Sequence, residues 1–168
     1  MIIINILISF FLQSILTNFI SLNTKFLNPL FVLSSLILIC PYFKNNYKYY
    51  ITALLMGFSY DALFSALPFQ NAFVFVLLSY IIRFLYKNFR ENFLSIHIFQ
   101  FIIIFFYRVF DYLLLIMIED YDFTINNFNK ILLSSFLLNM IYITVLYFIM
   151  NYITKILEKK FKKNIKKI

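Results

Sequence analysis

The sequence is short of the residue types on which most enzyme sites depend. Its 168 residues include one glycine, one cysteine, one histidine, no tryptophan and seven acidic residues. A single cysteine cannot close an internal disulfide. One cysteine and one histidine are also too few ligands for a Cys/His metal cluster. The sequence also lacks a glycine-rich phosphate loop, an HExxH pair and a Ser-His-Asp order. We therefore expect neither an enzyme nor a bound metal or cofactor.

What the sequence has in excess is apolar side chains. It is 63% hydrophobic, whereas soluble proteins are roughly 45–50% apolar. Continuous apolar runs, several of them near the length of about 17–25 residues that a spanning helix needs, predict an all-α, polytopic bundle of six transmembrane helices. The expected spans are Ile2–Leu22, Phe26–Phe43 (with Pro29 in its first turn), Tyr49–Phe64, Phe69–Tyr86, Phe93–Ile118 and Ile131–Ile153. The bundle would occupy residues 1–153 and a basic cytoplasmic tail residues 154–168.

The basic residues predict the orientation of these spans. Lys and Arg collect on the cytoplasmic side of membrane proteins. If the N-terminus is inside, the inner connections hold Lys44, Lys48, Lys87 and Arg90, and the outer ones hold Lys25 and Lys130. Both termini are then cytoplasmic in a multi-pass protein of the cell inner (plasma) membrane. The tail adds seven inner lysines, at positions Lys155, Lys159, Lys160, Lys162, Lys163, Lys166 and Lys167.

The basic tail has two interpretations. It is either a plain topology anchor or an amphipathic helix lying on anionic lipids of the inner leaflet. The formal net charge of +8 is concentrated there, which favours lipid over nucleic acid as the partner.

Small and polar residues indicate which faces of the spans pack together. Ala53, Gly57 and Asp61 recur every four residues, so they share one face of the third helix, where small residues allow a close approach of another helix. Gln13 belongs to a polar stripe on the first span, with Ser9, Thr17 and Ser21. We expect these faces to point into the bundle.

The fifth span carries an aligned set of polar residues. His97, Gln100, Arg108 and Asp111 fall within a narrow arc of the helix. Arg108 and Asp111 are spaced to pair with each other. Because Asp61 and Arg108 have similar expected depths, we predict one intramembrane cluster of Asp61, Arg108 and Asp111. It would act either as a structural clasp or as a partner contact or relay.

The third and fourth spans carry a resemblance to a known family. The segment from Gly57 to Phe75 reads GFSYDALFSALPFQNAFVF, and this order of Gly, three residues, Asp, a turn and a second apolar helix resembles the rod shape-determining protein MreD family. The pair Gln13-Ser14 and the position of Pro29 also fit. The family usually has glycines around the turn, where this chain has Ser65 and Gln70.

The resemblance implies a non-enzymatic component of the bacterial cell-elongation machinery. Its implied partners are a bitopic MreC-like protein, MreB filaments and cell-wall synthases, and a homodimer is compatible with it. The family's fold is similar to that of the substrate-binding subunits of energy-coupling-factor transporters. Such an uptake subunit is therefore the alternative function, and a small membrane enzyme acting on lipid-linked substrates is a third.

Overall fold

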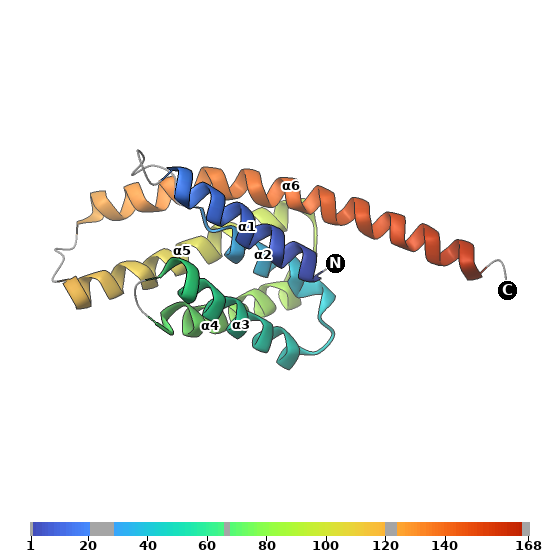
Figure 1. Cartoon of the computed structure of the whole chain (residues 1–168), viewed down its shortest axis with the longest axis horizontal. Helices are drawn as coiled ribbons and strands as arrows, with labels where there is room; N and C mark the ends of the chain where they lie inside the picture. Colours follow the sequence, from blue (N-terminus) through green and yellow to red (C-terminus); the bar gives the residue numbers. More distant parts are fainter. Residues whose placement is uncertain (1, 21–28, 66–67, 120–123, 166–168) are drawn as a thin grey trace.

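The computed structural model of the chain describes residues 2–20, 29–65, 68–119 and 124–165. Within these ranges it is all-α, as the sequence predicts. Figure 1 shows the helices gathered side by side, with α6 reaching far beyond the others at its C-terminal end. The elements are α1 (Ile2–Ile20), α2 (Phe31–Ile39), the 3-10 segment η1 (Cys40–Tyr42), α3 (Asn46–Phe64), α4 (Gln70–Asn88), α5 (Phe93–Glu119) and α6 (Ile125–Ile165).

The short helix α2 is the centre of the bundle. All nine of its residues, Phe31 to Ile39, are buried, and α2 contacts α1, α3, α4, α5 and α6. It carries two serines, Ser34 and Ser35, among apolar residues. A helix that is apolar on all sides must be surrounded by other helices or by lipid, and here the other helices provide that environment.

The start of α2 differs from the sequence prediction. Pro29 and Leu30 are not helical, and the helix begins at Phe31. The expectation that Pro29 lies in the first turn of a helix is therefore wrong. Leu30 is the N-cap of α2 with a non-helical backbone (φ −125°, ψ 47°), and its N–H binds Asn139 of α6, so this contact places the helix start after the proline. At about 1.5 Å per residue, nine residues are too short to cross the roughly 30 Å hydrocarbon core.

Within the part of the chain that the structure describes, two helices are long and apolar enough to cross a membrane. They contain the stretches Phe93–Leu114 in α5 and Ile125–Ile156 in α6, and shorter apolar stretches occur in Ile2–Asn18 and Phe31–Tyr42. Helices α3 and α4 are 19 residues long, but charged side chains interrupt them. The crossing of all six expected spans therefore stays a prediction.

Helix α6 also departs from the expected boundaries. The predicted span ended at Ile153, whereas α6 runs without a break for 41 residues to Ile165. Its length is about 60 Å, more than the roughly 40–45 Å of a whole bilayer. The start of the basic tail is thus a continuation of the last helix, and Lys166 and Lys167 lie outside the described residues.

Helices α3 and α4 approach each other closely at Gly57. A Cβ atom placed on Gly57 would lie 2.5 Å from Ala72 Cα and 2.6 Å from the backbone oxygen of Asn71. Ala53, one turn earlier, is fully buried. The small-residue face of α3 therefore receives the first turn of α4, and the one glycine of the sequence stands where a side chain would meet backbone.

The residue before α4 has an uncommon backbone conformation. Phe69 is the N-cap of α4 and has a φ of 66°, a left-handed geometry that costs a non-glycine residue about 1–2 kcal/mol. Its ring packs edge-on against Phe58, with the centroids 5.3 Å apart. This position is next to Gln70, one of the two turn positions where glycine is usual in the family that the sequence resembles.

We predict that Gly57→Ala destabilises the protein. Alanine in a helix is normally better than glycine by about 1 kcal/mol, but here the methyl group would force α3 and α4 apart, at a cost of about 1–3 kcal/mol. The measurement is the melting temperature of the detergent-solubilised protein followed by circular dichroism. Ser59→Ala, at an exposed position of the same helix, is the control and should melt within a few degrees of the wild type. A Gly57→Ala protein that melts above the wild type would contradict the packing.

Candidate functional site

The carboxylate of Asp61 binds the first turn of α4. Its Oδ1 atom accepts hydrogen bonds from the backbone N–H of Asn71 (3.0 Å) and from Asn71 Nδ2 (2.8 Å), and its Oδ2 atom accepts one from the N–H of Ala72 (3.0 Å). Asp61 is 7% exposed. The first N–H groups of a helix have no partner within the helix and attract negative charge. Asp61 therefore acts as a cap for α4 that is supplied by the neighbouring helix.

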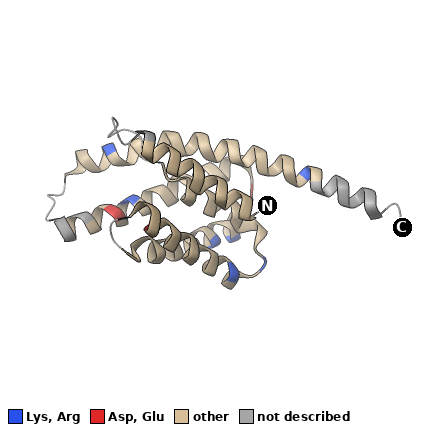
Figure 2. Ribbon diagram, in the orientation of Figure 1, with Lys and Arg blue, Asp and Glu red and all other residues tan. Residues whose placement is uncertain are grey.

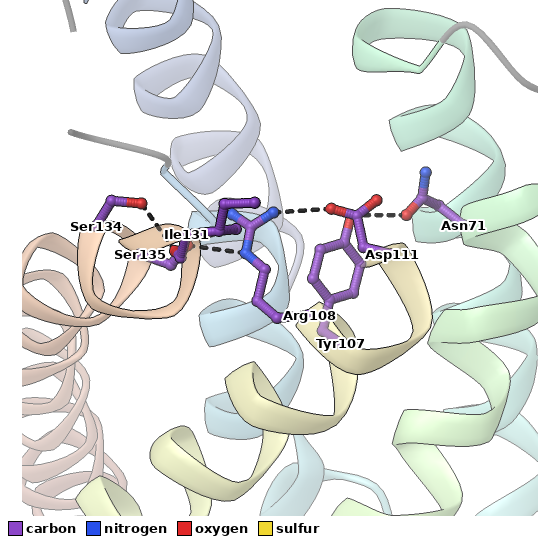
Figure 3. Close-up of polar contacts among 7 residues, drawn as sticks. All are labelled: Asn71, Tyr107, Arg108, Asp111, Ile131, Ser134 and Ser135. Atoms are coloured by element: carbon purple, nitrogen blue, oxygen red, sulfur yellow. Dashed lines mark hydrogen bonds and ion pairs between the residues drawn. The ribbon is translucent and has the colours of Figure 1, made fainter. Parts of the chain in front are cut away.

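Arg108 lies between α5 and α6 (Figure 3). Its Nη1 atom is 2.9 Å from Asp111 Oδ2, and its Nε atom donates to Ser135 Oγ of α6 at 2.8 Å. The Ser135 hydroxyl in turn donates to the Ile131 carbonyl. Arg108 is 4% exposed and Asp111 is 31% exposed. The ion pair thus neutralises a buried arginine and extends to the last helix.

A hydrogen bond between α4 and α5 places the two charged groups in one polar region. Tyr107 Oη donates to Asn71 Oδ1 at 2.9 Å, and the guanidinium of Arg108 lies 5.5 Å from the centre of the Tyr107 ring. Figure 3 shows Tyr107 pointing to Asn71 while Arg108 points to Asp111 and Ser135. Asp61 therefore reaches α5 through Asn71.

The predicted direct meeting of Asp61 with Arg108 is wrong. Among the described residues, the ion pair of Arg108 is with Asp111, and the three hydrogen bonds of Asp61 go to α4. The backbone N–H groups at the start of α4 are fixed next to Asp61, so they satisfy its carboxylate without a cation.

The N-terminus of the central helix α2 is capped in the same way, by side chains from two other helices. The N–H of Leu30 donates to Asn139 Oδ1 of α6 at 2.7 Å, and the N–H of Val32 donates to Gln13 Oε1 of α1 at 3.1 Å. Gln13 and Asn139 are both buried. Gln13 of the polar stripe of α1 therefore binds the start of α2. Ser9 and Thr17 donate to backbone carbonyls within α1, and Ser21 lies outside the described residues.

The C-terminal end of α2 is held by Arg83 of α4. Its Nη1 atom donates to the Cys40 carbonyl at 3.1 Å, its Nη2 atom to the Phe43 carbonyl at 2.9 Å, and its Nε atom to Asn46 Oδ1 at 2.7 Å. Cations are favourable at helix C-termini, where carbonyl groups lack partners. Tyr49 adds a hydrogen bond from its hydroxyl to the carbonyl of Leu36 at 3.0 Å.

Two further polar residues of the fifth span, Gln100 and His97, also join helices. Gln100 Nε2 donates to Ser34 Oγ of α2 at 2.6 Å. His97 Nε2 is 2.9 Å from Thr144 Oγ1 of α6. Among the described residues there is no group of three or more His, Cys, Asp or Glu side chains that could hold a metal ion.

A comparison with known protein families identifies the family of this chain. The model of the rod shape-determining protein MreD matches residues 1–157, which is nearly the whole chain. The chain belongs to the MreD family. Searches of curated proteins and of solved structures found no match.

The family assignment agrees with the buried polar contacts of this MreD-family chain. MreD proteins are membrane proteins that determine cell shape, and the family is not known for catalysis. The buried polar groups described above bind one another and the ends of helices. Such an arrangement fixes how helices pack.

Several polar residues of these contacts were not singled out from the sequence, among them Arg83, Asn71, Ser135 and Asn139. Arg83 carried a usable signal, since a charge inside an apolar run must have a partner. The other three are uncharged and gave no such signal.

Double-mutant cycles should separate the two charged groups. We expect Arg108→Gln and Asp111→Asn to be coupled by about 0.5–3 kcal/mol, because the two residues are in contact. Asp61→Asn should be close to additive with Arg108→Gln, since their side chains bind different partners. The measurement is the unfolding free energy of each single and double variant in detergent. Stronger coupling of Arg108 to Asp61 than to Asp111 would contradict the assignment.

Proposed function

We propose that this MreD-family chain is an integral membrane scaffold of the bacterial cell-elongation machinery. It would bind a bitopic MreC-like protein and couple cytoplasmic MreB filaments to peptidoglycan synthesis. The observation that carries the proposal is the family match over residues 1–157. The structure adds a physical reason, because its buried polar groups are used to fix helix packing.

A scaffold in lipid needs a rigid shape and an apolar surface for a partner helix. Rigidity is supplied by the caps on both ends of α2 and on the start of α4. Large apolar side chains are exposed along α6, with Leu133, Leu137 and Ile141 each more than 60% exposed. In a membrane these side chains face lipid or another helix.

We further propose six membrane crossings with both termini in the cytoplasm. Because α2 alone is too short to cross, the second crossing would take the whole expected span Phe26–Phe43. Several of the blue basic segments in Figure 2 lie at the bundle end that contains the start of α3 and the end of α4. Lys44, Lys48, Arg83, Lys87 and Arg90 belong to this end. By the tendency of basic residues to stay inside, it faces the cytoplasm, and the start of α6 faces the outside.

Cysteine labelling in intact cells tests this orientation. In a Cys40→Ala background, Asn126→Cys at the exposed start of α6 should react with a membrane-impermeant maleimide. Lys48→Cys, exposed near the start of α3, should react only after the cells are permeabilised. The opposite pattern would invert the topology, and labelling of both positions in intact cells would contradict the six-crossing arrangement.

The cellular role is tested by complementation and copurification. In a rod-shaped bacterium that has lost its own MreD protein, expression of this chain together with its MreC-like partner should restore rod-shaped cells. The tagged chain should also retain that partner through detergent purification, whereas an unrelated single-span protein should be lost. Round cells and no copurification, with the chain present in the membrane, would refute the proposed role.

A further inference from the structure

A polar cavity lies at the end of the bundle where α3 starts and α4 ends. It has a volume of about 380 Å³ and is lined by Asn46, Arg83, Tyr86 and Lys87. This volume is at the lower end of the range of about 300–1,000 Å³ that is typical of ligand pockets. None of the contacts that hold the helix ends together fills it.

The groups that line the cavity are hydrogen-bond donors. Lys87 has an exposed ammonium group, and the Asn46 amide uses its oxygen to accept from Arg83, which leaves its NH2 group as a donor. The Tyr86 hydroxyl is buried and has no hydrogen-bond partner among the described residues. A buried hydroxyl without a partner costs free energy, and a ligand with acceptor oxygens would remove that cost.

The charge of the cavity is positive and fixed in place. Arg83 is held by two backbone carbonyls and one amide oxygen, all of them neutral acceptors. The structure shows one ion pair among the described residues, between Arg108 and Asp111 at another place in the bundle. Within the described part of the chain, no carboxylate therefore pairs with Arg83 or Lys87. An arginine whose orientation is fixed by neutral groups keeps its charge available to an anion.

One acidic residue lies in the neighbourhood. Glu91 follows the end of α4 and is close enough to Tyr86 to act on its hydroxyl electrostatically. Partial desolvation raises the pKa of the Glu91 carboxyl above its usual value. Glu91 does not line the cavity.

We propose that this cavity binds a phosphate group, with Arg83 and Lys87 supplying charge and Tyr86 and Asn46 donating hydrogen bonds. Phosphate offers several acceptor oxygens to donors that come from different directions. At the surface of an inner leaflet the abundant phosphate is that of anionic phospholipid headgroups. Free inorganic phosphate has the same chemistry and is the second source to be distinguished.

Titration of the purified full chain in detergent tests the site. Phosphatidylglycerol should raise the melting temperature saturably, and phosphatidylcholine should not, because its headgroup has no net charge. Lys87→Gln and Tyr86→Phe should each weaken the apparent affinity by about tenfold, the loss of one charge-assisted contact. Tyr86→Phe keeps the ring that packs against Phe99 and removes a buried hydroxyl that has no partner among the described residues, so its unliganded melting temperature should not fall and should rise slightly.

Matched controls decide between this cavity and general surface charge. Lys48→Gln removes an exposed lysine on α3, the helix that contributes Asn46, but it does not line the cavity. Its affinity should stay within about twofold of the wild type. A loss equal to that of Lys87→Gln, or full binding by Lys87→Gln and Tyr86→Phe, would overturn the site and leave the basic tail as the binder.

Inorganic phosphate is titrated in parallel to identify the source. Protection by phosphate that depends on Lys87 and Tyr86 would support the site with a soluble anion as its ligand. Protection by phosphatidylglycerol alone would support a lipid headgroup. No saturable effect of either would overturn the proposal, and the measurement does not depend on the cell-elongation role.

Discussion

The fold depends on side chains that satisfy the backbone N–H groups of helices beginning inside the bundle. In an apolar medium an unpaired backbone group costs several kcal/mol, and water cannot replace the missing partner. The starts of α2 and α4 receive their acceptors from α1, α3 and α6 through Gln13, Asp61 and Asn139. These bonds fix the positions of helices against one another, because each joins one helix end to a different helix. The apolar side chains then pack around α2 in the helix arrangement that these polar contacts set.

The sequence predicted the helical class and the approximate places of most helices because long apolar runs leave few alternatives. Spacing alone also placed Ala53, Gly57 and Asp61 on one face and Arg108 next to Asp111. Gly57 carried additional information, since glycine is so rare here that its presence indicated a steric need. The structure explains this need, because a Cβ atom on Gly57 would lie too close to the Cα atom of Ala72.

The partners of these residues could not be predicted from the sequence, for a physical reason. A cap depends on where a helix begins and which neighbour lies opposite, and both are set by the tertiary packing. The apolar run from Phe26 to Phe43 gave no sign that its helix starts only at Phe31. The prediction that Asp61 meets Arg108 rested on side-chain charges, helix faces and expected depths, whereas the partial positive charge at the N-terminus of α4 was the nearer partner. Asn139 was overlooked because an uncharged amide in an apolar run gives little signal.

The bond between Leu30 and Asn139 joins positions 109 residues apart, which affects how the chain is made. A ribosome adding about 5–20 residues per second needs roughly 5–20 s to synthesise that interval. During this time α2 has left the ribosome while its acceptor on α6 does not yet exist. Gln13 is present from the beginning, but it satisfies Val32 and not Leu30. The N–H of Leu30 therefore lacks this partner until the last helix has been translated.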